Sequence, residues 1–160
     1  MEQQTVSKIE TIRKMKTGSG VIGAVCMVSV VIYIVAAIMM FITMKEIHGG
    51  PESRQAFIKN IFSYGMDSCV MFLASAVFFR IARNGCPFIP SNILIVRVIG
   101  AILILNGVIS AAIPAVMLET PKLLVSMINP SGIASGLLVI FISYIMHYAS
   151  LLQVESDETL

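Results

Sequence analysis

Long apolar blocks alternate with short charged stretches along the 160-residue chain. Residues 20–44 and 98–118 contain no charged side chain, residues 61–79 contain only Asp67, and residues 131–154 contain none besides His147. A membrane-spanning helix needs about 20 apolar residues. The pattern therefore predicts an all-α membrane protein, a four-transmembrane-helix bundle that forms one domain over residues 1–160, with spans at about 19–44, 61–83, 93–118 and 130–153.

Composition agrees with this prediction. Hydrophobic residues make up 57% of the chain and charged residues 12%, whereas about 25% of the residues in a soluble domain are charged. The first apolar block is longer than the apolar core of a cleavable signal, which has about 7–15 residues. The sequence "MKEIHGG" follows it in place of a small-residue cleavage site. We therefore expect the block to be retained.

Basic residues are concentrated on one side of the predicted topology. The N-terminal tail and the turn between the second and third spans carry more Lys and Arg than the other two loops, and residues 80–97 contain no acid. The positive-inside rule then places both termini in the cytoplasm, with the basic tail over anionic lipid. The net charge of +2 gives no reason to expect direct nucleic-acid binding. The basic residues on this side are Lys8, Arg13, Lys14, Lys16, Arg80, Arg83 and Arg97.

The stretch "RIARNGCPFIPSN", residues 80–92, joins the second and third spans. Gly85 is placed to adopt a left-handed conformation after the second helix, and Pro87 prevents that helix from continuing. We expect Phe88 to insert at the membrane interface. Ser91 or Asn92 is expected to cap the third helix, and Arg97 to extend back toward the headgroups. These roles explain the turn without any chemistry.

Two features favour close helix packing. Gly132 and Gly136 form a G-x-x-x-G pair, and Gly107 begins a series of small residues spaced by four. Such positions let helix backbones approach closely in lipid. The pair suits packing within the chain, which we favour because three other helices are available, and it also suits a homo-oligomer. Asn129 and Pro130 are typical of a cap and first turn that begin the fourth span.

Asp67 is the candidate intramembrane polar site. Insertion of a mid-membrane aspartate costs about 2.5–3.5 kcal/mol, so we expect the side chain to face the interior of the helix bundle. It lies roughly 9 Å deep, near the level of Ser110 and Ser135. Without a cationic partner, a carboxyl in this environment favours its neutral form. The two interpretations are a carboxyl hydrogen-bonded to hydroxyl groups, which holds helices together, and a proton or cation relay. Asn106 is a further candidate for hydrogen bonding between helices.

Other chemistry lacks the residues it would need. No nucleophile, base and acid occur in a catalytic arrangement, so we do not expect an enzyme. No cofactor is implied, and His48 and His147 lie on opposite faces of the predicted membrane protein, too far apart to share a metal. Cys26, Cys69 and Cys86 lack metal-ligand spacing and are expected to be free thiols.

The turn also resembles a known pattern. Gly85, Pro87, Phe88 and Asn92, followed by "VRVIG" with Arg97, look like the signature turn of a bacterial family of small four-helix membrane proteins, catalogued only as a domain of unknown function. Members often end in an acidic tail with a D-x-T-hydrophobic motif. Glu155, Asp157 and Thr159 stand in that place here. The resemblance implies a location in the cytoplasmic (inner) membrane of a bacterium, and it implies a partner, because members are frequently encoded beside a Cro-like helix-turn-helix regulator.

Three hypotheses about function follow. The first is a non-enzymatic membrane protein that contacts the lipid bilayer and holds or sequesters a small cytoplasmic transcriptional regulator. The second is a small transporter or ion-conducting protein that uses Asp67. The third is a protein that protects the membrane.

Overall fold

Four helices make up the described part of the protein in a computed structural model that describes residues 2–44, 51–117 and 129–158. Each helix is long and apolar enough to cross a membrane, and these residues contain no strand, which confirms the predicted fold class. The second helix begins at Pro51, before the apolar block of residues 61–79. The helices are α1 (Glu2–Met44), α2 (Pro51–Asn84), α3 (Pro90–Met117) and α5 (Pro130–Glu158).

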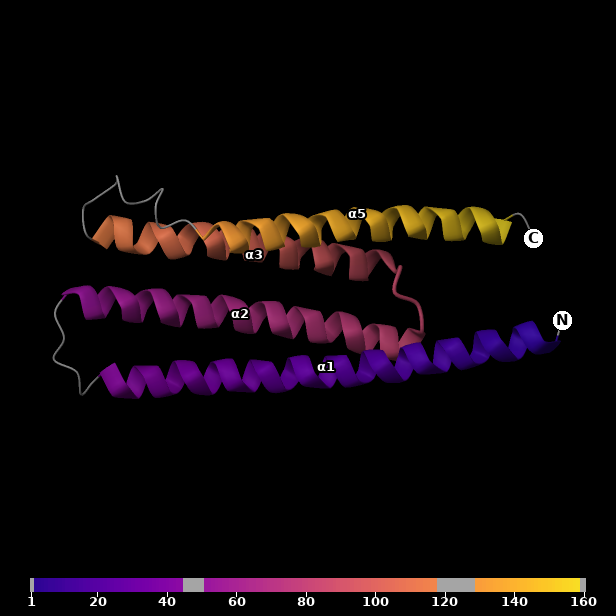
Figure 1. The fold of residues 1–160 in the computed structure, drawn as a ribbon, viewed down its shortest axis with the longest axis horizontal. Helices are drawn as coiled ribbons and strands as arrows, with labels where there is room; N and C mark the ends of the chain where they lie inside the picture. The colour runs from indigo at the N-terminus through magenta and orange to yellow at the C-terminus, as the bar shows by residue number, and fades with distance from the viewer. Residues whose placement is uncertain (1, 45–50, 118–128, 159–160) are drawn as a thin grey trace.

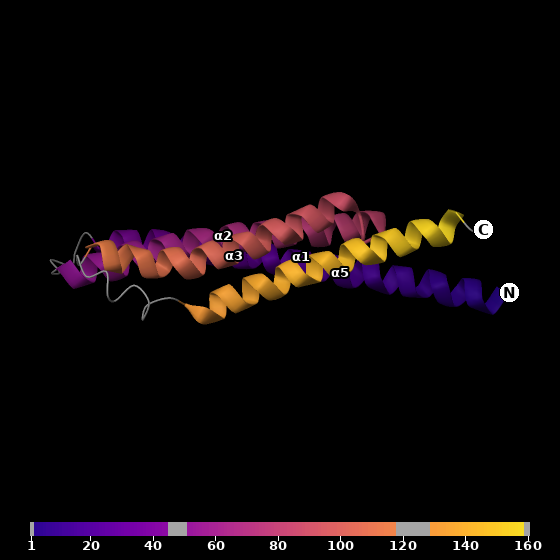
Figure 2. The same cartoon turned by 90° about the horizontal axis from the view of Figure 1, so that it is seen from above.

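The helices lie side by side in chain order. Figure 1 shows α1, α2, α3 and α5 in succession, and Figure 2 shows that α5 runs obliquely to the others. Within the described ranges, the helix pairs in contact are α1 with α2, α2 with α3, and α3 with α5. The arrangement is therefore an open row, with α1 and α5 as the outer helices.

Both chain ends lie at the same end of the molecule as the α2–α3 turn (Figure 1). We call this the turn end; it comprises α1 up to Gly20, residues 80–97, and α5 from Tyr144 onward. The 43 residues of α1 give a helix of about 65 Å, roughly twice the thickness of the hydrocarbon core. The basic N-terminal segment is thus a straight continuation of the first predicted span and projects beyond the α2–α3 turn.

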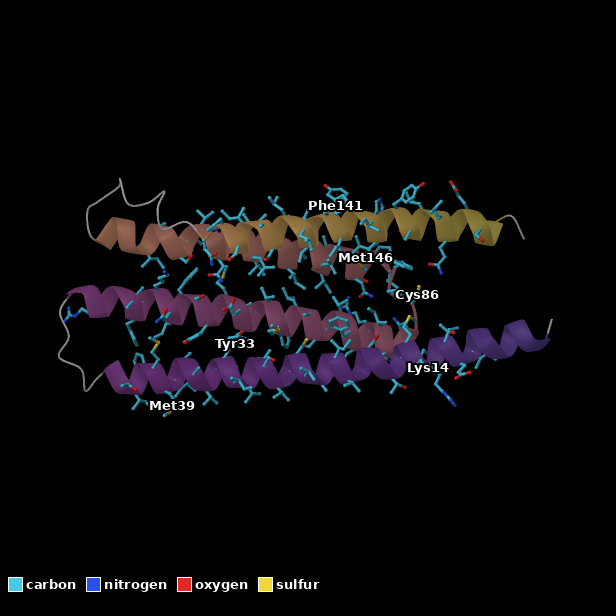
Figure 3. The ribbon with its side chains drawn as sticks, viewed as in Figure 1. Lys14, Tyr33, Met39, Cys86, Phe141 and Met146 are labelled. Atoms are coloured by element: carbon cyan, nitrogen blue, oxygen red, sulfur yellow. The ribbon has the colours of Figure 1, made fainter. Side chains whose placement is uncertain are left out.

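Helices α1 and α2 form an antiparallel pair through small and aromatic side chains. A Cβ atom added at Gly23 would lie 3.3 Å from the Phe79 ring, so this glycine allows the ring to sit against the α1 backbone. Tyr33 lies on the side of α1 that faces α2 (Figure 3), with its ring centroid 6.2 Å from that of Tyr64. Together these contacts hold the pair along its length.

Helices α3 and α5 approach more closely, through glycines on both helices. A Cβ at Gly136 would lie 2.6 Å from the Gly100 carbonyl oxygen, and one at Gly107 would lie 3.1 Å from the Asn129 carbonyl oxygen. A Cβ at Gly132 would lie 3.4 Å from the Gly107 Cα. The G-x-x-x-G pair therefore packs against α3 within the chain, as the sequence favoured.

Asn129 caps α5 as predicted. Its Oδ1 accepts hydrogen bonds from the Gly132 N–H at 3.3 Å and from the Ser131 hydroxyl at 2.6 Å. Its own N–H donates to the Gly107 carbonyl at 3.3 Å. The capping residue Asn129 therefore also fixes the beginning of α5 against α3.

Candidate functional site

The α2–α3 turn begins at Gly85, which has the predicted left-handed conformation. Its φ is +72°, and its N–H donates to the Ile81 carbonyl at 2.7 Å, closing the end of α2. A Cβ at this position would lie 2.6 Å from Lys16 Cε. Lys16 of α1 therefore crosses directly over the turn, and the turn is in contact with the projecting part of α1.

The expected cap of α3 is wrong. The helix begins at Pro90, so Ser91 and Asn92 lie inside its first turn, and the Ile89 carbonyl accepts the first N–H groups, those of Asn92 and Ile93. Asn92 is fully buried, and its Nδ2 donates to the Pro87 carbonyl at 3.4 Å. Its role is to tie the turn to α3, because the two prolines already set the helix start.

Arg97 also differs from its expected placement. Its guanidinium lies 4.9 Å from the centroid of the Tyr144 ring of α5, in a cation–π contact, instead of extending freely to the headgroups. Its Nε is buried and has no hydrogen-bond partner among the described residues. Arg97 thus joins α3 to α5 just above the turn.

A groove runs between the turn and the last part of α5. It has a volume of about 480 Å³, and a smaller hollow of about 240 Å³ adjoins it, sharing Pro90 and His147 and reaching Arg97. The Cys86 thiol lies 3.9 Å from Gln153 Oε1 across the groove, and Figure 3 shows Cys86 at the turn. The lining is largely apolar: Cys86, Phe88, Pro90, His147, Ser150, Leu151, Gln153 and Val154.

The acidic end adjoins this groove in sequence. Val154 lines the groove, and Glu155 is the next residue of α5, with an exposed side chain. Asp157 lies in the last turn of the same helix, whereas Thr159 lies outside the described residues. The turn and the start of the acidic end are therefore at one end of the molecule.

Asp67 does not use the expected hydroxyl groups. Its Oδ1 accepts a hydrogen bond from Asn106 Nδ2 of α3 at 3.2 Å, while Ser110 donates to the Gly107 carbonyl and Ser135 is exposed. Asn106, the other candidate from the sequence, is thus the partner because it lies on the face of α3 that packs against α2. Asn106 Oδ1 is buried and has no described partner; a neutral carboxyl has an O–H that suits such an acceptor.

The remaining candidates for chemistry are the cysteines and the side chains that could bind a metal. Cys26, Cys69 and Cys86 are free thiols, as expected. In the parts of the chain that the structure describes, no group of three or more His, Cys, Asp or Glu side chains is placed to hold a metal ion.

Sequence reasoning missed the α5 side of the groove and the contact of Arg97 with Tyr144. Residues 86–90 and 147–154 are far apart in the chain, and only the packing of α5 on α3 brings them together. The one signal available was the set of glycines on both helices, which predicts close packing but not which neighbour is chosen.

The class of the protein follows from the four helices, whose length and apolar composition are compatible with a multi-pass integral membrane protein. Comparisons of the chain with protein-family models, characterised proteins and solved structures find no match. The resemblance to the four-helix bacterial family therefore stays a prediction.

Proposed function

We propose that the protein is a non-enzymatic protein of a bacterial cytoplasmic membrane that holds a small helix-turn-helix regulator at its turn end. The observation that carries this proposal is the groove between the turn and α5. It brings the segment that resembles the family signature, residues 85–92, against the part of α5 that leads into the acidic end. Two separate segments thus form one surface.

The chemistry of this surface suits a small basic protein. Phe88, Leu151 and Val154 offer apolar contacts, and the exposed Glu155 follows Val154 directly. The sequence adds a second acid, Asp157, two residues further on. Acidic side chains would steer a DNA-binding partner toward the groove and would compete with the DNA phosphates for its basic residues. Binding at the membrane would then keep the regulator away from its operator.

Co-purification of the regulator encoded next to the gene tests this proposal. We expect the intact protein to retain the regulator, and the chain truncated after Gln153 to retain less, with a larger difference at low salt than at high salt. Phe88→Ala should also weaken retention, because it removes an apolar side chain from the groove. Phe141→Ala is the matched control, since Phe141 is 64% exposed and points away from the other helices (Figure 3). Equal retention by all four proteins, or by none, would argue against the groove as the docking surface.

Transport through Asp67 is the second candidate function. The observation that favours it is the bond between Asp67 and Asn106, which places an intramembrane carboxyl at the contact between the α1–α2 and α3–α5 pairs. A relay requires a carboxyl that releases its proton, and Asp67→Asn abolishes that capacity while keeping a hydrogen-bonding group. Proton uptake by vesicles that contain the wild type but not by vesicles that contain Asp67→Asn would support transport, and equal uptake would exclude Asp67 as a relay.

A further inference from the structure

A second hollow lies at the turn end, apart from the groove. Its volume is about 430 Å³, within the range of about 300–1,000 Å³ that is usual for small-molecule sites. The last turn of α2 contributes Arg80, Arg83 and Asn84, and Ile89 and Ser91 complete it from the turn and the start of α3. It shares no lining residue with the groove that faces α5.

The hollow is strongly positive. Arg80 and Arg83 are three residues apart on α2 and so project from one face of the helix. Both are exposed, and neither forms an ion pair with a described side chain. The sequence contains no Asp or Glu from residue 68 to residue 118. The segments of α2 and α3 that line the hollow therefore contain no acidic side chain that could neutralise the two guanidinium groups.

The helix ends at the hollow do not remove this charge. The carbonyl end of α2 is partially negative, and the N–H end of α3 at Pro90 and Ser91 is partially positive, so the two dipoles offset each other. The Ser91 hydroxyl adds a hydrogen-bond donor next to the arginines. Asn84, in the same turn of α2 as Arg83, supplies an amide donor. The hollow therefore combines two positive charges with neutral hydrogen-bond donors.

The position of the hollow limits which ligand reaches it. The apolar span of α2 ends at Asn84, and the next apolar span begins at Pro90. The hollow therefore lies where both spans leave the apolar layer, which is the level of the lipid headgroups. Arginine binds phosphate oxygens in a bidentate geometry, and basic pockets between spanning helices bind anionic headgroups.

We propose that Arg80, Arg83, Asn84 and Ser91 form a site for the phosphate of an anionic phospholipid headgroup. A bound lipid would fix the end of α2 to the start of α3, with its acyl chains along the exposed apolar surface of the spans. The proposal is independent of any partner in the groove, because the two hollows share no lining residue.

Native mass spectrometry of the protein in non-ionic detergent, with added phosphatidylglycerol, tests the site. We expect the wild type to retain one lipid in preference to phosphatidylcholine, and R80Q/R83Q to retain it about tenfold less well, since hydrogen bonds between charged groups contribute strongly to binding. The matched control is R54Q/K59Q, which removes the same charge from the opposite end of the same helix. Neither Arg54 nor Lys59 lines the hollow, so the control should bind as the wild type does.

Three results would overturn the proposal. The first is equal retention of phosphatidylglycerol by the wild type and R80Q/R83Q. The second is an equal loss in R54Q/K59Q, which would indicate attraction to overall charge. The third is displacement of the lipid by inorganic phosphate at the lipid concentration, which would identify a free anion as the ligand. If R80Q/R83Q does not fold, R80K/R83K decides the question: it keeps the charge but loses the bidentate geometry, so retention should fall, and unchanged retention would contradict the site.

Discussion

The hydrogen bond between Asn106 and Asp67 is the polar contact that joins α2 to α3 inside the apolar layer. A lone carboxyl there is costly to insert, and the bond offsets part of that cost. The geometry requires a side chain at position 67 that accepts a hydrogen bond, and an amide oxygen meets this requirement as well as a carboxyl oxygen does. Charge at Asp67 is therefore not needed for the packing of the two helices.

Substitution at Asp67 separates hydrogen bonding from charge. Asp67→Asn should leave the free energy of unfolding nearly unchanged, whereas Asp67→Leu should lower it by about 1 kcal/mol, the usual size of such a bond in a membrane. Unfolding of the purified protein in mixed detergent micelles measures both values. A double-mutant cycle with Asn106→Leu should show that the two leucine substitutions are not additive. Additive losses would mean that the two side chains do not interact.

Gly85 gives the second prediction at a single position. Gly85→Ala should lower the free energy of unfolding by about 1–2 kcal/mol, because an L-residue is disfavoured at a φ of +72° and its Cβ would meet Lys16. Gly65→Ala, within α2, is the control, since nothing lies within 4 Å of a Cβ there. The control should be neutral or slightly stabilising. An equal decrease in the free energy of unfolding of both variants would show that the left-handed conformation at Gly85 does not determine the loss of stability.

The contact between α3 and α5 depends on glycines that bring two backbones together. Gly100 and Gly136 face each other, and each would place a Cβ within 2.8 Å of the other residue's carbonyl oxygen. Backbone atoms cannot move aside as a flexible side chain does, so added volume separates the helices. The same separation would pull Tyr144 from Arg97 and open the groove.

Gly136→Ala tests this contact. We expect the free energy of unfolding to fall by about 1–3 kcal/mol, the usual cost of overpacking. Gly18→Ala should have no such effect, because a Cβ at Gly18 meets nothing within 4 Å. Thermal unfolding of both variants in detergent provides the comparison. A Gly136→Ala protein as stable as the wild type would contradict the close approach of α3 and α5.

The sequence predicted the positions and ends of the helices better than the contacts between them. Apolar blocks, Gly85 and the Asn129 cap mark helices and their ends, because chain length in lipid and local turn chemistry are encoded locally. The contacts of Asp67 with Asn106 and of Arg97 with Tyr144 depend on which faces of neighbouring helices pack together. Apolar side chains are needed against lipid as well as against helices, so hydrophobic periodicity does not reveal those faces.

The open row gives the molecule two outer helices with broad apolar surfaces. α1 exposes Val25 and Ile32, and α5 exposes Leu138 and Phe141, each by more than half. In water such surfaces would drive aggregation, whereas lipid covers them at no cost. The row is therefore consistent with a membrane environment, and it makes the order of the helices a property that cross-linking can test.

Engineered disulfides test the row. In a variant without the native cysteines, Gly20→Cys with Ala82→Cys should form an intramolecular disulfide, because the two Cβ positions are 3.8 Å apart, the usual separation in a disulfide of about 3.8 Å. Val21→Cys with Ala82→Cys is the matched control, since Val21 is 60% exposed; it should remain reduced. Migration on non-reducing gels distinguishes the outcomes. Cross-linking of the control alone would contradict the α1–α2 pairing.

We expect the four spans to place both termini and the α2–α3 turn on the cytoplasmic side, where the groove and the arginine hollow would be accessible from within the cell. Paired phosphatase and fluorescent-protein fusions at residues 50, 86, 125 and 160 measure this directly. We expect phosphatase activity at residues 50 and 125, and fluorescence at residues 86 and 160. Phosphatase activity at the C-terminus, or opposite locations for residues 86 and 160, would contradict this topology.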